Sequence, residues 1–219
     1  MALPWLQRVE LTLLAAAFLC GAVAAVALTR TQGSFRGSCP LYGAATLNGT
    51  SLALSQPSAP SLCYFVTGAS GFLALYCLLH LLFWVYSSCI EDSYRGPIGL
   101  RIALAVSVLA IFLLLVSACI LHFGTSSLCK SIVSQNITNS CSAAQKIRWT
   151  PPGIALQFYS NLYNAEISSW VNLLLWCVVL VLQIVQWKSE ATSFRPRQRG
   201  DPAWSSETDV LVGTRLPYY

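Results

Sequence analysis

The residues with the most chemistry to offer in this 219-residue chain are nine cysteines and two histidines. Four of the cysteines lie inside uncharged apolar stretches, where a thiol behaves as a small apolar side chain: Cys20, Cys77, Cys119 and Cys177. The chain has no Cys-X-X-Cys pair and no cysteine–histidine spacing of the kind that binds zinc. We therefore expect no metal site and no cofactor.

His80 is the one ionisable residue well inside an apolar stretch, whereas Glu10 and His122 lie at the ends of such stretches, where we expect water to reach them. A lone histidine without an acid, a second histidine or a metal beside it more often hydrogen-bonds between helices than relays protons. No acid–base or nucleophilic pair can be assembled from the apolar stretches. The sequence predicts that the chain is not an enzyme.

The other cysteines lie outside the apolar stretches. Separations of 24 and 12 residues favour disulfides between Cys39 and Cys63 and between Cys129 and Cys141, while bridges that join the two pairs stay open as the alternative. Cys89 directly follows an apolar stretch, where a juxtamembrane cysteine can be palmitoylated, and an unmodified thiol is the alternative there.

Two Asn-X-Thr glycosylation acceptors accompany the paired cysteines. Asn48 begins Asn48-Gly49-Thr50 and Asn136 begins Asn136-Ile137-Thr138. Disulfides form on the oxidising side of a membrane, which is also the side on which these asparagines are modified. Both features place their two segments on the outer side.

The elements that must position these residues are membrane spans. Hydrophobic residues make up 55% of the chain and charged residues only 10%, with a mean hydropathy of +0.60, which is too apolar for a soluble domain. The uncharged stretches that are long enough to cross a bilayer are 11–29, 62–86, 102–123 and 167–187. We expect an all-α membrane protein, a four-transmembrane-helix antiparallel bundle with two disulfide-braced outer loops.

The segments between the spans alternate between the two sides of the membrane. Eight lysines and arginines fall in the cytosolic segments against five in the outer loops, which favours cytosolic N- and C-termini. The predicted segments are a cytosolic N-terminus (1–10), outer loop 1 (30–61), a cytosolic turn (87–101), outer loop 2 (124–166) and a disordered cytosolic tail (188–219). A cleaved signal peptide over the first span, which would leave three spans, is the alternative.

Finer features can be predicted inside these segments. Outer loop 1 is rich in Gly, Ser, Ala and Pro, so we expect an irregular chain there. After the Pro-Pro-Gly break at 151–153, apolar residues recur at Ile154, Phe158 and Leu162, which predicts a helix that runs into the fourth span. The short connection at 87–101 makes spans two and three antiparallel neighbours.

Small and polar side chains inside the spans predict how the helices pack. Ala17, Gly21 and Ala25 recur every fourth residue and would let another helix approach closely. Asn172 and Gln183, with Ser107 and Ser117, can hydrogen-bond between helices.

Several short motifs, spread along the whole chain, resemble the transmembrane protein 179 family. They are Cys39-Pro40-Leu41-Tyr42-Gly43, Cys89-Ile90-Glu91-Asp92-Ser93, Trp149-Thr150-Pro151-Pro152-Gly153, Ser169-Trp170-Val171-Asn172 and Ser205-Ser206-Glu207-Thr208-Asp209. The resemblance implies a multi-pass membrane protein and supplies no catalytic or ligand-binding residues. Claudins share the four-span layout, but their tryptophan and paired-cysteine signature is absent from 30–61, so we do not expect a barrier role.

From these features we expect a tetraspan interaction protein, an accessory or scaffolding subunit for other membrane proteins in the lipid bilayer. An oligomeric channel or transporter component, built along Asn172 and Gln183, is the alternative. The excess of positive charge lies in the outer loops, so no nucleic-acid partner is expected, while a homo-oligomer is compatible with the sequence. The expected location is the secretory pathway, at the plasma membrane or a vesicle or granule membrane.

Overall fold

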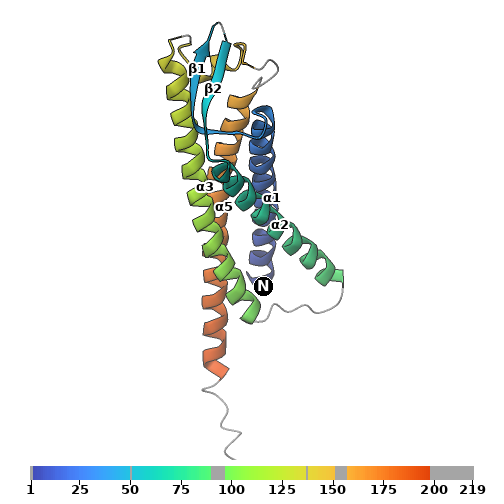
Figure 1. The fold of residues 1–219 in the computed structure, drawn as a ribbon. Coiled ribbons are helices and arrows are strands. Elements are labelled where there is room, and N and C mark those ends of the chain that lie inside the picture. Colours follow the sequence, from blue (N-terminus) through green and yellow to red (C-terminus); the bar gives the residue numbers. More distant parts are fainter. Residues whose placement is uncertain (1, 50, 90–96, 137, 151–156, 198–219) are drawn as a thin grey trace, which may run out of the picture.

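A computed structural model describes residues 2–49, 51–89, 97–136, 138–150 and 157–197. Long helices dominate it: α1 (Ala2–Ser34), α2 (Pro60–Cys89), α3 (Pro97–Ser134) and α5 (Phe158–Arg197) (Figure 1). The smaller elements are the strands β1 (Cys39–Asn48) and β2 (Ser51–Ser58) and the short helix α4 (Cys141–Ala144). The helices α2 and α3 both begin at a proline, a residue that suits the first helical turn because it lacks the N–H that would be unpaired there.

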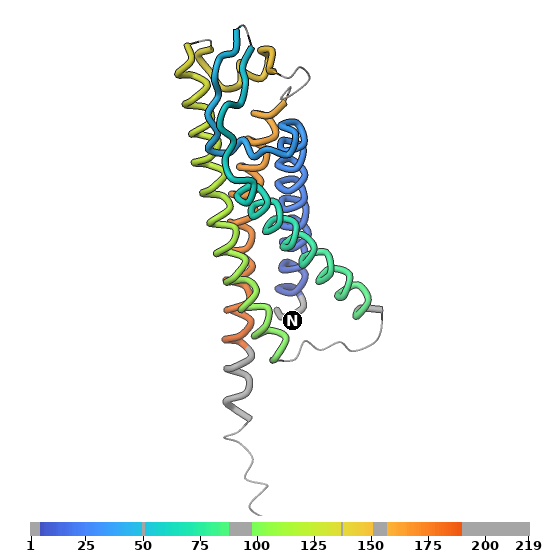
Figure 2. The backbone as a smooth tube through the Cα atoms, viewed as in Figure 1, coloured from blue at the N-terminus to red at the C-terminus, as the bar shows by residue number. Residues whose placement is uncertain are grey.

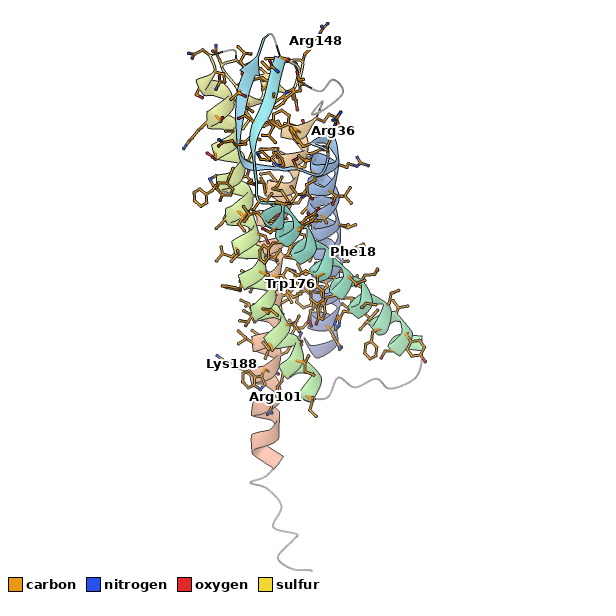
Figure 3. The ribbon with its side chains drawn as sticks, viewed as in Figure 1. Phe18, Arg36, Arg101, Arg148, Trp176 and Lys188 are labelled. Atoms are coloured by element: carbon orange, nitrogen blue, oxygen red, sulfur yellow. A yellow bond between two sulfur atoms is a disulfide. The ribbon has the colours of Figure 1, made fainter. Side chains whose placement is uncertain are left out.

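All four long helices are long and apolar enough to cross a membrane. In the most apolar 18-residue stretch of each helix, 33% of the residues are buried inside the bundle. The outer surface of the helices is therefore largely apolar, as contact with lipid hydrocarbon requires. Phe18 and Trp176 lie in the middle of the bundle, whereas the labelled charged residues lie at its two ends: Arg36 and Arg148 at one end, Arg101 and Lys188 at the other (Figure 3).

The helices do not pack equally on one another. The central helices are α1 and α5, because α1 packs against α5 and α2, and α3 packs against α5. The C-terminal half of α2 leans away from α3 and α5 (Figure 2), and the two helices that the short connection was expected to hold together make few contacts. The expectation that spans two and three are antiparallel neighbours therefore holds in part: α2 and α3 contact each other, but each packs more extensively on another helix, α2 on α1 and α3 on α5.

Most of the segment expected to be irregular, 30–61, forms an antiparallel β-hairpin instead, and its two ends belong to α1 and α2. Asn48 pairs with Ser51 at the end of the hairpin, and Gly49, the first residue of the tight connection between them, takes the left-handed backbone conformation (φ 65°), which suits a two-residue hairpin turn. The register shifts between Cys39 and Ala44, where Tyr42 also has a positive φ of 59°. The prediction was wrong because the Gly and Ser residues were interpreted as loop formers, although Leu52 and Leu54 alternate with small residues as strand residues do.

Each long helix extends beyond its predicted span. The helix expected around Phe158 and Leu162 begins at Phe158 and is continuous with the fourth span, which confirms that prediction for the described residues, while Ile154 lies outside them. At its other end α5 continues to Arg197, so the first ten residues of the segment predicted as a disordered tail, 188–197, are helical. Residues 198–219 lie outside the described part of the chain.

Candidate functional site

The two segments predicted as outer loops fold together into one unit, which we call the disulfide lobe. It consists of β1, β2, the end of α3 (124–134), α4 and residues 145–150, and it sits at the end of the bundle opposite the N-terminus (Figure 1). The lobe and the adjoining helix ends share one hydrophobic core, separate from a second core deeper in the bundle.

Three aromatic rings from distant segments form the centre of the lobe's core. The rings belong to Phe35, which directly follows α1, to Trp149, and to Phe158, the first residue of α5. They make edge-to-face contacts with ring centroids 5.2 to 6.0 Å apart. Trp149 is 4% exposed, and its indole Nε1–H donates a hydrogen bond to the Ala144 carbonyl at 3.0 Å. Edge-to-face pairs add roughly 0.5 to 1.5 kcal/mol beyond the burial of their area. These contacts fix the lobe to two of the membrane helices.

Backbone hydrogen bonds join the two loops directly. The Leu52 N–H donates to the Arg148 carbonyl at 3.0 Å, and the Thr150 N–H donates to the Leu52 carbonyl at 2.8 Å, so that residues around Trp149 add a short parallel bridge to β2. On the other side of the hairpin, the Ala45 N–H of β1 donates to Ser131 Oγ of α3 at 2.9 Å. Both edges of the hairpin therefore have partners from the second loop.

Glycine makes the close contact between β1 and α3 possible. A Cβ atom added at Gly124 would lie 3.0 Å from Leu41 Cβ and 3.1 Å from Leu41 Cδ2, which is tighter than ordinary van der Waals contact. Leu41 is itself fully buried. The hairpin thus packs directly on the helix backbone at this point.

Both predicted disulfides are present, and both connect residues within one loop. Cys39–Cys63 ties the start of β1 to the first turn of α2, and Cys129–Cys141 ties α3 to α4. The alternative in which bridges join the two loops is excluded. The cross-loop connection is made instead by the hydrogen bonds at Leu52 and by the aromatic cluster.

Just below the lobe, His122 on α3 and Glu166 on α5 form a contact of 2.7 Å between Nδ1 and Oε1. The histidine side chain is 54% exposed and the glutamate 18% exposed. Exposed pairs of this kind contribute at most about 1 kcal/mol. The contact orients the two helices where they enter the lobe.

A second group of polar residues lies at the other end of the bundle, and we call it the polar centre: Glu10, Ser107, Gln183 and Gln186. Gln183 Nε2 donates to Glu10 Oε1 at 2.8 Å, and Gln186 Nε2 donates to Glu10 Oε2 at 3.3 Å. Ser107 Oγ donates to Gln183 Oε1 at 2.8 Å. These hydrogen bonds join α1, α3 and α5 through one carboxylate.

The burial of Glu10 corrects an expectation from the sequence. Glu10 is only 2% exposed, whereas it was expected at a span end within reach of water. His80 was expected to have no acid near it in the spans, but Glu10 lies close to it. Both residues line the same small cavity of about 10 Å³, together with Gln7 and Trp84. A cavity of that size is near the lower limit for holding one water molecule. All four long helices thus contribute polar side chains around one point.

The packing residues predicted on α1 are partly as expected. Ala17 is 1% exposed and Gly21 is buried, as predicted. Ala25 is only half-buried, and Ala24 is buried in its place, because the buried positions of α1 follow one another in steps of three and four residues. A Cβ at Gly21 would lie 3.1 Å from the Ser70 carbonyl oxygen, 3.2 Å from Ala74 Cβ and 3.5 Å from Asn172 Nδ2. At Gly21, α1 therefore approaches both α2 and α5 closely.

The remaining predicted residues are placed as follows. Asn172 is 2% exposed, and its Oδ1 has no hydrogen-bond partner among the described residues. Asn48, at the end of β1, and Asn136, just past α3, are both exposed at the end of the disulfide lobe. Cys89 is the last residue of α2, and its side chain lies outside the described part.

Sequence reasoning missed Glu10, Gln186 and the cluster around Trp149 as a structural centre. The amides of Gln183 and Gln186, three residues apart on one helix, were a usable signal, because two amides on one face of a span need polar partners. Among the described residues, no three His, Cys, Asp or Glu side chains are grouped as metal ligands would be. The polar centre is thus an arrangement of hydrogen-bond donors around a carboxylate.

Comparison with known proteins assigns the chain to a family. Residues 6–212 match the family described as the Transmembrane protein 179/179B Claudin domain. The chain is 80% identical over 218 residues to human Transmembrane protein 179B, with all of both chains covered. It is 74% identical over 213 residues to the mouse protein of that name, covering 97% of each chain.

A more distant relative extends the likeness across vertebrates. The zebrafish protein of the same name is 37% identical over 212 residues, covering 95% of this chain and 96% of that protein. No solved structure matches the chain. The family is described as a claudin domain. The absence of the claudin first-loop signature from 30–61 therefore does not place this chain outside claudin-like domains. The chain is a multi-pass membrane protein and belongs to the transmembrane protein 179/179B claudin-domain family.

Proposed function

We propose that this chain is an accessory or scaffolding subunit that binds other membrane proteins and carries out no catalysis of its own. The observation that supports this most strongly is the disulfide lobe, in which both loops fold into one braced unit instead of merely connecting helices. Binding residues are commonly found on loops that a rigid scaffold holds in place. The lobe offers such a surface, and the outward apolar side chains of the bundle offer a lateral one.

The lobe has two large apolar side chains on its surface. Tyr42 is 43% exposed and Leu47 is 48% exposed, both on β1. Exposed aromatic and aliphatic side chains on a rigid element are typical anchors of protein interfaces. We therefore place the partner-binding face of the lobe on β1.

The proposed orientation has both termini in the cytosol and the lobe on the lumenal or extracellular side. It is supported by the two disulfides, which need an oxidising compartment, and by the exposure of Asn48 and Asn136 at the end of the lobe. In this orientation both asparagines carry glycans, and the protein resides in a secretory-pathway membrane, at the plasma membrane or in vesicles or granules.

Proximity labelling followed by co-purification in mild detergent tests the proposal. Wild type is compared with Tyr42→Ser/Leu47→Ser, and with Lys146→Ala as a control that changes an exposed polar residue of the same lobe. We expect one stoichiometric membrane-protein partner that the double variant loses and the control keeps. A partner retained by the double variant would remove β1 from the interface, and the absence of any reproducible partner from all three preparations would overturn the accessory role.

One observation favours a second function, an oligomeric channel or transporter component. A carboxylate buried within a membrane bundle is expensive and usually functional, and Glu10 is such a group. Purified protein in liposomes would then pass ions or small solutes, and Glu10→Gln or Asn172→Leu would abolish the flux while the bundle stays folded. Wild-type liposomes that are no leakier than empty ones would exclude this function.

A further inference from the structure

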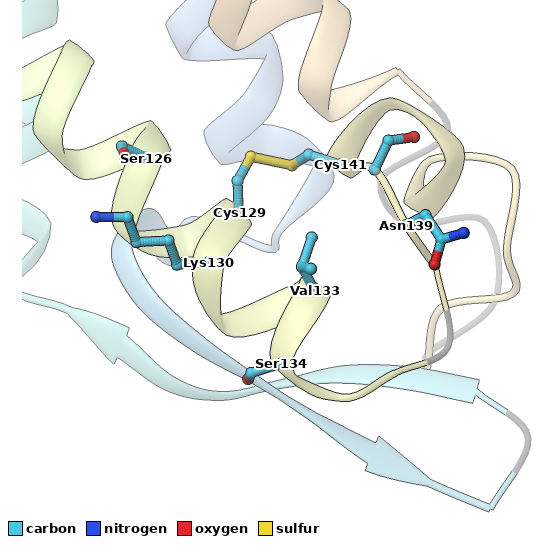
Figure 4. Close-up of a pocket in the computed structure, with 8 residues that line it drawn as sticks. Ser126, Cys129, Lys130, Val133, Ser134, Asn139 and Cys141 are labelled. Atoms are coloured by element: carbon cyan, nitrogen blue, oxygen red, sulfur yellow. A yellow bond between two sulfur atoms is a disulfide. The ribbon is translucent and has the colours of Figure 1, made fainter.

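The two disulfides differ in how far solvent can reach them. Cys39 and Cys63 are both 0% exposed and belong to the lobe's hydrophobic core. Cys129 and Cys141 are partly exposed and line an open groove of about 570 Å³ (Figure 4). One disulfide is therefore sealed inside the fold, while the other packs against the same core through Cys141 and also lines the groove.

We propose that Cys129–Cys141 is a site of thiol–disulfide exchange, open to an external thiol while the protein stays folded. The inference does not depend on the accessory role proposed above. Exchange requires a thiolate to approach one sulfur in line with the S–S bond, so access to the sulfur decides which disulfide reacts. The groove provides that access to Cys129–Cys141, and the core denies it to Cys39–Cys63.

The reaction balances with a dithiol or with two molecules of a monothiol as the reductant. A thiolate RS⁻ attacks one sulfur of the pair and forms a mixed disulfide, and the S–S electron pair leaves on the other sulfur, which takes up a proton. A second thiolate attacks the mixed disulfide, releases RS–SR and leaves the second cysteine as a thiol. Two electrons and two protons pass to Cys129 and Cys141, and the external thiols are oxidised to one disulfide.

The groove also has features that suit an anionic thiol. Lys130 contributes to its lining next to Cys129, with the end of its side chain directed away from the disulfide, and Asn139 lies on the facing segment (Figure 4). An ammonium group on the wall of a cleft raises the local concentration of anions. The class of ligand that fits is a small thiol with carboxylate groups, of which glutathione is the probe used below.

Reduction would free only one corner of the lobe. The disulfide closes the segment 129–141, which carries Asn136. The neighbouring segment keeps its own anchors, since Trp149 is held by the Leu52 bridge and by Ala144, and Cys39–Cys63 stays closed. Exchange would therefore loosen the surface around Asn136 and leave the rest of the lobe in place.

The test uses full-length protein in nanodiscs, with free thiols first blocked by N-ethylmaleimide. Samples are exposed to reduced glutathione or to uncharged dithiothreitol, alkylated at intervals and analysed by peptide mass spectrometry, while near-UV circular dichroism reports folding. We expect Cys129 and Cys141 to become alkylated at least about 10-fold faster than Cys39 and Cys63, because the reaction depends on access. Equal rates, or reaction of Cys129 and Cys141 only when the dichroism signal is lost, would overturn the inference.

Two variants separate exchange through the groove from general loosening of the lobe. Val133 lines the groove and is 39% exposed, so Val133→Trp should narrow it and slow the reaction with both reductants. Lys130→Gln should slow glutathione more than dithiothreitol, since the attacking glutathione thiolate carries one more net negative charge than the dithiothreitol thiolate. If neither variant changes either rate, the thiols do not approach through this groove and the assignment fails.

Discussion

A double-mutant cycle on Glu10 and Gln183 provides the sharpest test of the polar centre. The two side chains are 2% and 3% exposed and meet at 2.8 Å between Oε1 and Nε2, although 173 positions separate them in the chain. Interhelical side-chain hydrogen bonds in membranes average about 0.6 kcal/mol and reach about 1.7 kcal/mol. A carboxylate acceptor at this distance belongs near the upper limit, because charge-assisted bonds are the stronger ones. We expect a coupling energy of about 1.5 kcal/mol.

The single substitutions should cost more than the coupling alone. Glu10→Ala leaves the amides of Gln183 and Gln186 without their acceptor, and a buried donor without a partner costs about 1 to 3 kcal/mol. Gln183→Ala removes the acceptor of the Ser107 hydroxyl as well. We expect each to lower the free energy of unfolding by about 2 kcal/mol or more, on the scale of one unpaired buried group.

Unfolding by sodium dodecyl sulfate in mixed micelles, followed by tryptophan fluorescence, measures all four proteins of the cycle. Arg8→Ala serves as the control, because it removes a charge from the same turn of α1 at an exposed position and should change stability by less than about 0.5 kcal/mol. A coupling energy near zero, with Glu10→Ala no more destabilising than Arg8→Ala, would refute the reasoning, since it would mean that water and not the amides solvates the carboxylate.

Three further predictions concern the helix crossing and the lobe. Gly21→Leu should lower the unfolding free energy by about 1 to 3 kcal/mol, because the contacts of 3.1 and 3.2 Å leave no room for a side chain. Gly68→Leu, with nothing within 4 Å, should not lower it, because leucine has the higher helix propensity. An equal loss of stability in both variants, in the same unfolding assay, would contradict the close crossing. Trp149→Phe should lower lobe stability by about 1 kcal/mol through loss of the indole hydrogen bond, seen as faster limited proteolysis, and unchanged cleavage would count against it. Asn48→Gln and Asn136→Gln should each remove one glycosidase-sensitive shift on a gel, and a wild-type protein without any shift would argue against the proposed orientation.

The membrane architecture could be predicted from the sequence because its signal is local. Four uncharged apolar runs can only be membrane spans, and separations of 24 and 12 residues limit which cysteines pair most easily. The helix beginning near Phe158 was predictable for the same reason, since the apolar period of its first turns continues into the span.

The lobe and the polar centre could not be predicted, because they depend on contacts between distant segments. Trp149 pairs with Leu52 at the edge of the hairpin, and these residues are 97 positions apart in the chain, so no local sequence pattern predicts the pairing. Glu10 looks like a water-exposed residue near a chain end until Gln183 and Gln186 are known to face it. The hairpin could not be predicted for a different reason: Asn48-Gly49 is a turn signal that coincides with a glycosylation acceptor.

The uninterrupted length of α5 has a mechanical consequence. Its 40 residues make a rod of about 60 Å, twice the thickness of the hydrocarbon layer. One end, at Phe158 and Leu162, is fixed in the core of the lobe, and Gln183 and Gln186, about two thirds of the way along the helix, form hydrogen bonds with α1 and α3. A helix without a proline inside its membrane span transmits tilt along its axis, and one degree at the lobe moves the far end by roughly 1 Å, from the length of the rod. A tilt of the lobe would therefore displace the opposite end of α5 without any conformational change within the helix.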